Sequence, residues 1–149
     1  ISDYDKGYIN DDDLWHLCNN FNRPVFVDTK KRRLFHKDNV FWKINKKEYD
    51  LLDKDHLPNA SHLIVTLGSA GAMWSGMKFL PQVVKVFDVC GAGDTFMAAL
   101  VYEFLKTKNM QKSIDLANRA AAISVTHPGA YYLNKNDIES LYGGGNERN

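Results

Sequence analysis

The most constraining feature of this sequence is a series of short apolar runs, each of which is followed by a polar residue or a glycine. The runs are Val25–Val27 before Asp28, Val40–Ile44 before Asn45, and Leu63–Leu67 before Gly68. Parallel strands that are buried on both faces read as continuous apolar runs of this kind. Helical patterns accompany them at residues 11–21 and 46–53. Together these patterns predict an α/β fold built on a mostly parallel sheet.

The second half of the chain has a different pattern, in which short β-type runs are followed by long helical stretches. Short β-type runs at 72–75, 78–80 and 82–87 are separated by Gly76 and Pro81 and predict antiparallel edge strands. Apolar residues at helical spacing then predict helices over 92–107, 114–125 and 136–142. Residues 143–149 form a polar, glycine-rich end that we expect to be a flexible tail.

Composition excludes several classes of protein. The chain has 149 residues, 44% of them hydrophobic, with 19 basic and 18 acidic side chains and a net charge of +1. A balanced charge gives no field that favours nucleic acid or a membrane surface, and neither a membrane span nor a signal peptide is evident. Two distant cysteines predict no disulfide framework, and the histidines lack zinc spacing. We therefore expect a cytoplasmic protein without nucleic-acid or membrane partners.

Glycines at the start of the strongest predicted helix supply the clearest chemical signal. Gly91, Ala92 and Gly93 let backbone N–H groups converge at a helix N-terminus, where a phosphate or a developing anion is favoured. Asp94 adds a carboxylate beside that anion hole. Such a carboxylate can remove the proton from a hydroxyl that attacks phosphorus. From these residues alone, a tight turn with an acidic first helical turn is an equal alternative.

The stretch 88–101, DVCGAGDTFMAALV, resembles the second signature of the ribokinase-like (PfkB) carbohydrate kinase family at every defined position. The resemblance implies a three-layer α/β/α sandwich and an enzyme that transfers the γ-phosphoryl group of ATP to a sugar hydroxyl, with Mg²⁺. It also implies that Gly91 and Gly93 form the anion hole and that Asp94 is the general base. Cys90 replaces the usual Thr, and we expect a packing role for its thiol.

Two further segments follow in the family's order. Asn45 and Glu48 resemble its N-x-x-E motif, which positions Mg²⁺, commonly through water, and phosphate; a helix-capping box is the alternative. Residues 66–71 resemble its T-x-G-x-x-G turn, which implies that Thr66, Gly68 and Gly71 lie along the nucleotide phosphates.

The adenine side of the ATP site is implied by residues near the carboxyl end. Asn118, His127 and Gly129 match the helix and loop that border the adenine in the family. The alanines around Asn118 are equally typical of close helix packing. For His127 the favoured alternative is a solvated residue that caps a helix.

The opening segment narrows the resemblance to one branch of the family. Residues 2–7 and 27–30 resemble the S-D-Y-x-K-G and V-D-P-K segments of bacterial heptose 7-phosphate kinases, with Thr29 in place of the usual Pro. The resemblance implies that four residues contact a sugar or sugar-phosphate substrate: Asp3, Lys6, Asp28 and Lys30. Loop charges that serve solubility are the alternative. The basic run at 30–33 is interpreted as a solvated or phosphate-facing loop.

The resemblance covers residues 1–142 but only the carboxyl-terminal half of such a kinase. We therefore expect the ATP-side part of a kinase domain, with much of the sugar pocket absent. Two hypotheses remain: phosphoryl transfer to a heptose 7-phosphate-like sugar, or a nucleotide-binding module without catalysis. An exposed sheet edge predicts a homodimer or association with the missing amino-terminal half. The sequence leaves the particular sugar open.

Overall fold

The computed structural model describes residues 1–143, which belong to two compact units, Ile1–Lys78 and Phe79–Asn149. The flexible tail predicted for 143–149 lies outside the described residues, apart from Gly143, which ends the last helix. Within the described part of the chain, no helix combines the length and the apolar character needed to cross a bilayer.

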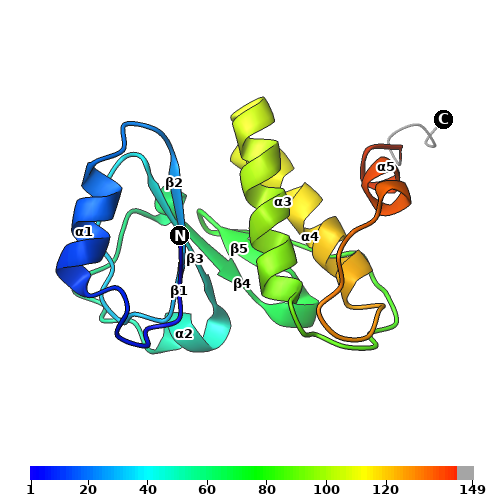
Figure 1. Cartoon of the computed structure of the whole chain (residues 1–149), viewed down its shortest axis with the longest axis horizontal. Helices are drawn as coiled ribbons and strands as arrows, with labels where there is room; N and C mark the ends of the chain where they lie inside the picture. The colour runs from blue at the N-terminus through cyan, green and yellow to red at the C-terminus, as the bar shows by residue number, and fades with distance from the viewer. Residues whose placement is uncertain (144–149) are drawn as a thin grey trace. The chain divides into compact units, whose positions relative to one another are not determined.

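The sheet has six strands in the order β1-β2-β3-β4-β5-β6 (Figure 1). Their bounds are Ser2–Asp3, Val25–Thr29, Val40–Asn45, Leu63–Thr66, Ala72–Trp74 and Met77–Phe79. Neighbours from β1 to β4 are parallel, whereas β4 and β5 are antiparallel, with Val65 opposite Met73. The predicted mostly parallel sheet with antiparallel strands at one edge is therefore confirmed.

Two helices accompany the parallel strands, α1 (Asp11–Asn19) and α2 (Lys46–Asp50). Helix α1 lies beside β1–β3, and its buried side chains Leu14 and Cys18 join the core of the first unit (Figure 1). That core also contains strand residues and two connecting residues, namely Val25, Val27, Leu34, Val40, Trp42, Ile44, Leu52, Leu63 and Val65. Both helices end earlier than predicted.

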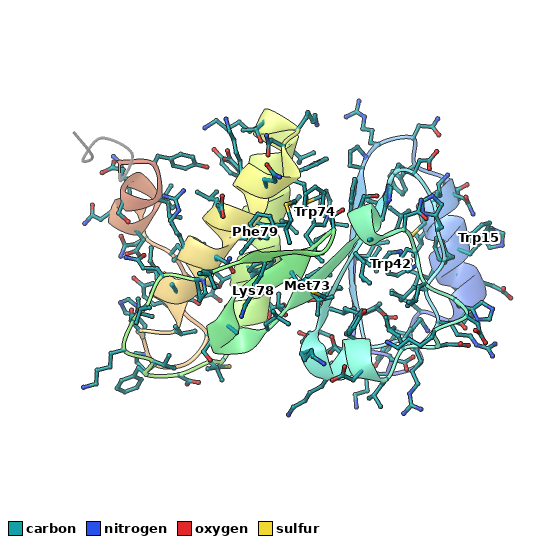
Figure 2. The ribbon with its side chains drawn as sticks, turned by 180° about the vertical axis from the view of Figure 1, so that it is seen from behind. Trp15, Trp42, Met73, Trp74, Lys78 and Phe79 are labelled. Atoms are coloured by element: carbon teal, nitrogen blue, oxygen red, sulfur yellow. The ribbon has the colours of Figure 1, made fainter. Side chains whose placement is uncertain are left out.

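The connection between β2 and β3, residues 30–39, contains no helix. Leu34 is buried in the core, and Phe35 packs edge-on against Trp15 and Trp42 at centroid distances of 4.8 and 5.0 Å. Figure 2 labels these two tryptophans on α1 and β3. The indole N–H of Trp42 donates to the Phe35 carbonyl at 3.0 Å. Apolar packing, and not a helix, therefore holds this connection between two parallel strands.

The second unit contains α3 (Ala92–Thr107), α4 (Met110–Ser124) and α5 (Lys135–Gly143). Helices α3 and α4 run side by side (Figure 1), joined by a tight turn in which Lys108 has a φ of 55°. Ala117 and Ala120 of α4 are fully buried, and Ala120 joins a small core cluster with Leu116 and with Leu141 of α5. Helix α4 begins four residues before the predicted start, because the Asn109 side chain accepts a hydrogen bond from Lys112 N and caps it.

The strand predicted over 82–87 is wrong. This segment has no ladder partner, and the amides of Phe87 and Asp88 both donate to the carbonyl of Val125, at 2.7 and 3.1 Å. Alternating side chains fit a strand, but a strand also needs a neighbouring backbone. Here the backbone donors go to the carboxyl end of α4 instead.

Candidate active site

The parallel strands bring several predicted site residues to one edge of the sheet. Asp3 ends β1, Asn45 ends β3 and Thr66 ends β4, and the strand register places Asn45 opposite Thr66. Asp28 lies one residue before the end of β2, opposite Lys43 of β3. Open α/β sheets bind ligands outside the carboxyl ends of their strands. The first unit thus presents polar groups where ligand binding is expected.

Two of the predicted substrate residues are already occupied by contacts within the protein. Asp28 forms an ion pair of 2.6 Å with the buried ammonium of Lys43. Asp3 is 6% exposed and accepts hydrogen bonds from the Thr29 hydroxyl and from Asp5 N. Both carboxylates therefore stabilise the ends of β1 and β2 through contacts within the first unit.

The two predicted substrate lysines, in contrast, extend into solvent. Lys6 is exposed and makes no hydrogen bond or ion pair with the described residues. Lys30 is exposed as well, and its ammonium lies 4.8 Å from the centre of the Tyr4 ring. Their positive charges remain open to an anionic ligand.

Lys31, in the middle of the basic run, is buried rather than solvated. Its ammonium lies 3.0 Å from Asp11, 3.3 Å from Asp5 and 3.8 Å from Asp3, and its side chain is 9% exposed. A pocket of about 400 Å³ opens beside it, lined by residues of the segment 5–12. The interpretation of the basic run as a solvated loop is thus wrong at this position.

Asn45 and Glu48 form the capping box that was the alternative to a magnesium role. The Asn45 side chain accepts from Glu48 N at 2.9 Å, and Glu48 Oε2 accepts from Asn45 N at 2.7 Å. At the carboxyl end of β3, Asn45 is exposed and Glu48 is half-buried. The capping box holds the carboxylate at the sheet edge, and its second oxygen is the kind of ligand that binds magnesium directly or through water.

The Thr66–Gly71 turn is built on left-handed glycines. Gly68 has a φ of 59° and Gly71 a φ of 90°, conformations that residues with side chains rarely adopt. A short hydrogen bond of 2.7 Å from Leu67 N to Gly71 O closes the turn, and the Thr66 hydroxyl donates to Ile44 O. Nothing lies within 4 Å of the position of a Cβ on Gly68, so a ligand can approach the backbone there.

The anion-hole loop, residues 88–93, runs into α3 in the second unit. Gly91 is the N-cap of α3 with a φ of 74°, and a Cβ on it would lie 3.3 Å from the Cβ of Ala130. Only a glycine combines this conformation with so close an approach. Asp94 lies exposed in the first helical turn, where the N–H group of Ala92 donates to the Val89 carbonyl at 3.3 Å and that of Gly93 has no partner within the helix. The glycine loop and the carboxylate thus lie together at this helix N-terminus, and their roles as anion hole and general base stay predictions.

Asp88 fixes the anion-hole loop from behind. One of its oxygens accepts from Cys90 N and the other from Gly129 N, both at 2.9 Å. These backbone hydrogen bonds, first that from Cys90 and then that from Gly129, hold the pKa of Asp88 below its ordinary value. The loop is therefore tied to residues 125–130, the segment in which His127 and Gly129 were predicted to border adenine.

The remaining predicted nucleotide residues also have internal partners. Asn118 is 5% exposed, and its side-chain amide donates to Phe79 O at 3.1 Å. His127 bonds the Ile123 carbonyl near the end of α4 and stacks on Tyr131 at 3.7 Å. Gly129 has a φ of 67°. The capping geometry expected as the alternative for His127 is thus present, while its contact with a nucleotide stays a prediction.

Lys31, Lys43 and Asp88 are the site-forming residues that were not singled out from the sequence. A lysine within the apolar run of β3 was a usable signal for Lys43, because such a charge needs a partner when the strand is buried. Asp88 was the first residue of the recognised signature. Nothing local distinguishes Lys31 from its exposed neighbours.

Comparison with known proteins identifies the family to which the chain is similar. The profile of the pfkB family carbohydrate kinases matches residues 39–137. The chain is 34% identical over 158 residues to the bifunctional protein HldE of Nitratiruptor sp., covering 93% of this chain and 34% of that protein. Probable fructokinase-3 of Arabidopsis thaliana is 34% identical over 95 residues, 56% of this chain and 28% of its own length. The chain thus spans about a third of these curated relatives.

Solved structures show the same fold. Ribokinase from Thermotoga maritima superposes with a TM-score of 0.71 at 23% identity, covering 95% of this chain and 56% of that one. Phosphofructokinase-2 from Escherichia coli, in complex with substrates and products, gives 0.69 at 17% identity, covering 95% and 54%. The ribokinase-like α/β fold predicted from the sequence is confirmed.

Proposed function

Because the chain belongs to the pfkB family of carbohydrate kinases, we propose that it carries the phosphoryl-transfer machinery of a sugar kinase that uses MgATP. The observation that carries the proposal is the start of α3, where Asp94 follows directly on a loop whose Gly91 has a φ of 74°. A fixed set of backbone donors beside an exposed carboxylate suits a reaction in which charge develops on a transferred phosphoryl group.

Asp94 acts as the general base in this proposal. Its carboxylate takes the proton of the attacking sugar hydroxyl as the bond from that oxygen to the γ-phosphorus forms and the bond to the ADP oxygen breaks. The N–H groups of residues 91–93 stabilise the charge on the phosphoryl oxygens. Positioning and electrostatics supply most of the catalysis in reactions of this type.

The nucleotide and metal roles remain proposals for each residue. Thr66, Gly68 and Gly71 lie along the phosphates, supported by the open approach to the Gly68 backbone. Glu48, held by Asn45, provides oxygen for Mg²⁺ or its water shell, and the bound ion would neutralise phosphate charge. Asn118, His127 and Gly129 border the adenine. ATP as the donor favours a cytoplasmic location.

A phosphorylated sugar, heptose 7-phosphate or a close analogue, is the proposed acceptor. Support comes from the S-D-Y-D-K-G opening and from the exposed, positively charged Lys6 and Lys30. Asp3 and Asp28 shape the acceptor side through their contacts with Thr29 and Lys43. Homodimerisation, or association with an amino-terminal half, would complete the sugar pocket.

The test is ADP release from MgATP with heptose 7-phosphate and a panel of simple sugars. We expect acceptor-dependent release that falls by about two to four decades in Asp94→Asn, because a positioned base is lost. Asp115→Asn removes the same charge from an exposed position on α4 and serves as the control. Undiminished release in Asp94→Asn contradicts the role of the base. Nucleotide binding without turnover in any arm favours the non-catalytic module.

A further inference from the structure

Residues 4–10 form a loop whose two ends are joined by one buried cation. The loop leaves β1 after Asp3 and enters α1 at Asp11, and it carries the exposed Lys6. The ammonium of Lys31 contacts Asp3 and Asp5 at the start of the loop, and Asp11 at its end. Lys31 lies two residues after the end of β2, and its one side chain contacts both flanks of the loop.

The loop contains conformations that need such support. Asp5 has a φ of 53°, an unfavourable conformation for a residue with a Cβ, and Gly7 has a φ of 85°. The Asp5 amide donates to Asp3 Oδ1 at 3.0 Å while the Asp5 carboxylate faces Lys31. Lys31 N in turn donates to the Thr29 hydroxyl, which donates to Asp3. The strained residue is therefore held on both its backbone and its side chain.

The charges around Lys31 indicate how loop 4–10 would respond to the loss of its ammonium group. Three carboxylates surround one ammonium, and Asp12 and Asp13 lie on the next residues of α1. Removing the ammonium leaves like charges facing one another around the pocket beside the loop, which favours an open arrangement.

We propose that Lys31 is a positioning residue that holds loop 4–10 closed, so that Lys6 is presented to the anionic group of the sugar-phosphate acceptor. The identity of the acceptor rests on the proposed function. The role of Lys31 in holding the loop rests on the contacts described above. Lys31 touches no reacting atom. It acts through Asp3, Asp5 and Asp11 on the placement of Lys6.

The experiment compares Lys31→Met with the unsubstituted chain by hydrogen exchange and by binding of heptose 7-phosphate without ATP. We expect the amides of residues 4–10 to exchange at least about tenfold faster, since charge-assisted contacts are lost. The dissociation constant for heptose 7-phosphate should rise by about tenfold. Exchange in α3 and α4 should not change.

Three further variants separate positioning from general loss of structure. Lys112→Met removes the same charge from an exposed position on α4 and should change neither readout. Lys31→Arg restores the charge and should recover most of the binding. Asp5→Asn with Asp11→Asn removes two partners that are 50% and 74% exposed, and it should loosen the loop even if Lys31→Met fails to fold.

If the amides of residues 4–10 exchange at an unchanged rate in both Lys31→Met and the double aspartate variant, Lys31 does not hold the loop closed. Faster exchange with unchanged affinity, or an unsubstituted chain that does not bind heptose 7-phosphate, overturns its link to the acceptor. Failure of ADP release alone counts against the proposed function and not against Lys31, because neither readout requires turnover.

Discussion

Loop 4–10 and the anion-hole loop 88–93 are both held in place, but by different forces. Loop 4–10 depends on side-chain charge, with Lys31 between Asp3, Asp5 and Asp11. The anion-hole loop depends on backbone hydrogen bonds to Asp88 and on the packing of Gly91 against Ala130. The proposed anion hole must hold its donors within tenths of an ångström, whereas the loop that we propose offers a charge to a substrate tolerates adjustment. The type of anchor thus matches the precision each task requires.

Breaking the backbone anchor should have the largest effect. Gly91→Ala adds a Cβ that would lie 3.3 Å from the Cβ of Ala130, in a residue with a φ of 74°. We expect it to lower the free energy of unfolding by about 2 kcal/mol and turnover by about 100-fold. Gly76→Ala is the matched control, because Gly76 has a φ of 76° with nothing within 4 Å of its Cβ position. It should cost about 1 kcal/mol and leave turnover intact.

A similar loss of turnover in both glycine variants would mean that backbone strain, rather than the contact with Ala130, explains the result. Denaturant unfolding and ADP release measured on the same samples separate the two effects.

Asp88→Asn should have a smaller, more selective effect. An amide can accept from only one of Cys90 N and Gly129 N, and its NH₂ group then faces the other donor. We expect affinity for ATP to fall by about tenfold while affinity for ADP falls less, because we propose that this loop contacts the γ-phosphoryl group, which ADP lacks. Calorimetric titration with each nucleotide measures both. Equal losses for ATP and ADP would contradict the assignment of this loop to the γ-phosphoryl group.

The contribution of the Lys31 ammonium to stability should depend on pH. Burial by itself would lower the pKa of the Lys31 ammonium, but hydrogen bonds to Asp11 and Asp5 outweigh it and raise the pKa above its ordinary value of 10.5. A raised pKa means that this contribution to stability is fully present below the unfolded-state pKa and is lost as the pH rises through the folded-state pKa.

We therefore expect Lys31→Met to reduce the free energy of unfolding by about 2 kcal/mol at neutral pH. The difference from the unsubstituted chain should stay constant up to the ordinary lysine pKa and shrink above it. Urea unfolding of both proteins over a pH series measures this difference. A difference that stays the same throughout the pH series, above the ordinary lysine pKa as well as below it, would show that Lys31 stabilises the loop through packing rather than charge.

Local patterns in the sequence predicted much of the fold. The apolar runs that became β2–β4 were recognised by continuity, and α3 follows the predicted bounds Ala92–Thr107 because Gly91 gives it a sharp start. The strand predicted at 82–87 is absent, because an alternating pattern describes the side chains of a segment and does not show whether a neighbouring strand is there to pair with it. The missing element here was a ladder, which no local pattern specifies.

Long-range partners explain what was missed in the site. Lys31 lies among exposed lysines and arginines, and its burial depends on carboxylates 20 or more residues earlier in the chain, at Asp3, Asp5 and Asp11. Asp28 read as a substrate ligand, yet Lys43 on the next strand neutralises it. The sequence shows which charged residues are candidates for a functional site. It does not show which of them are paired with one another in the folded chain.

The most direct test follows the phosphoryl group itself. ATP labelled on its γ-phosphorus is mixed with heptose 7-phosphate and the unsubstituted chain, or with Asp94→Asn, and the labelled products are separated. We predict that the label moves onto the sugar phosphate at a rate that is proportional to protein and lower by at least about 100-fold in Asp94→Asn. Label that appears only as inorganic phosphate, or that reaches the sugar equally fast in Asp94→Asn, would contradict the account.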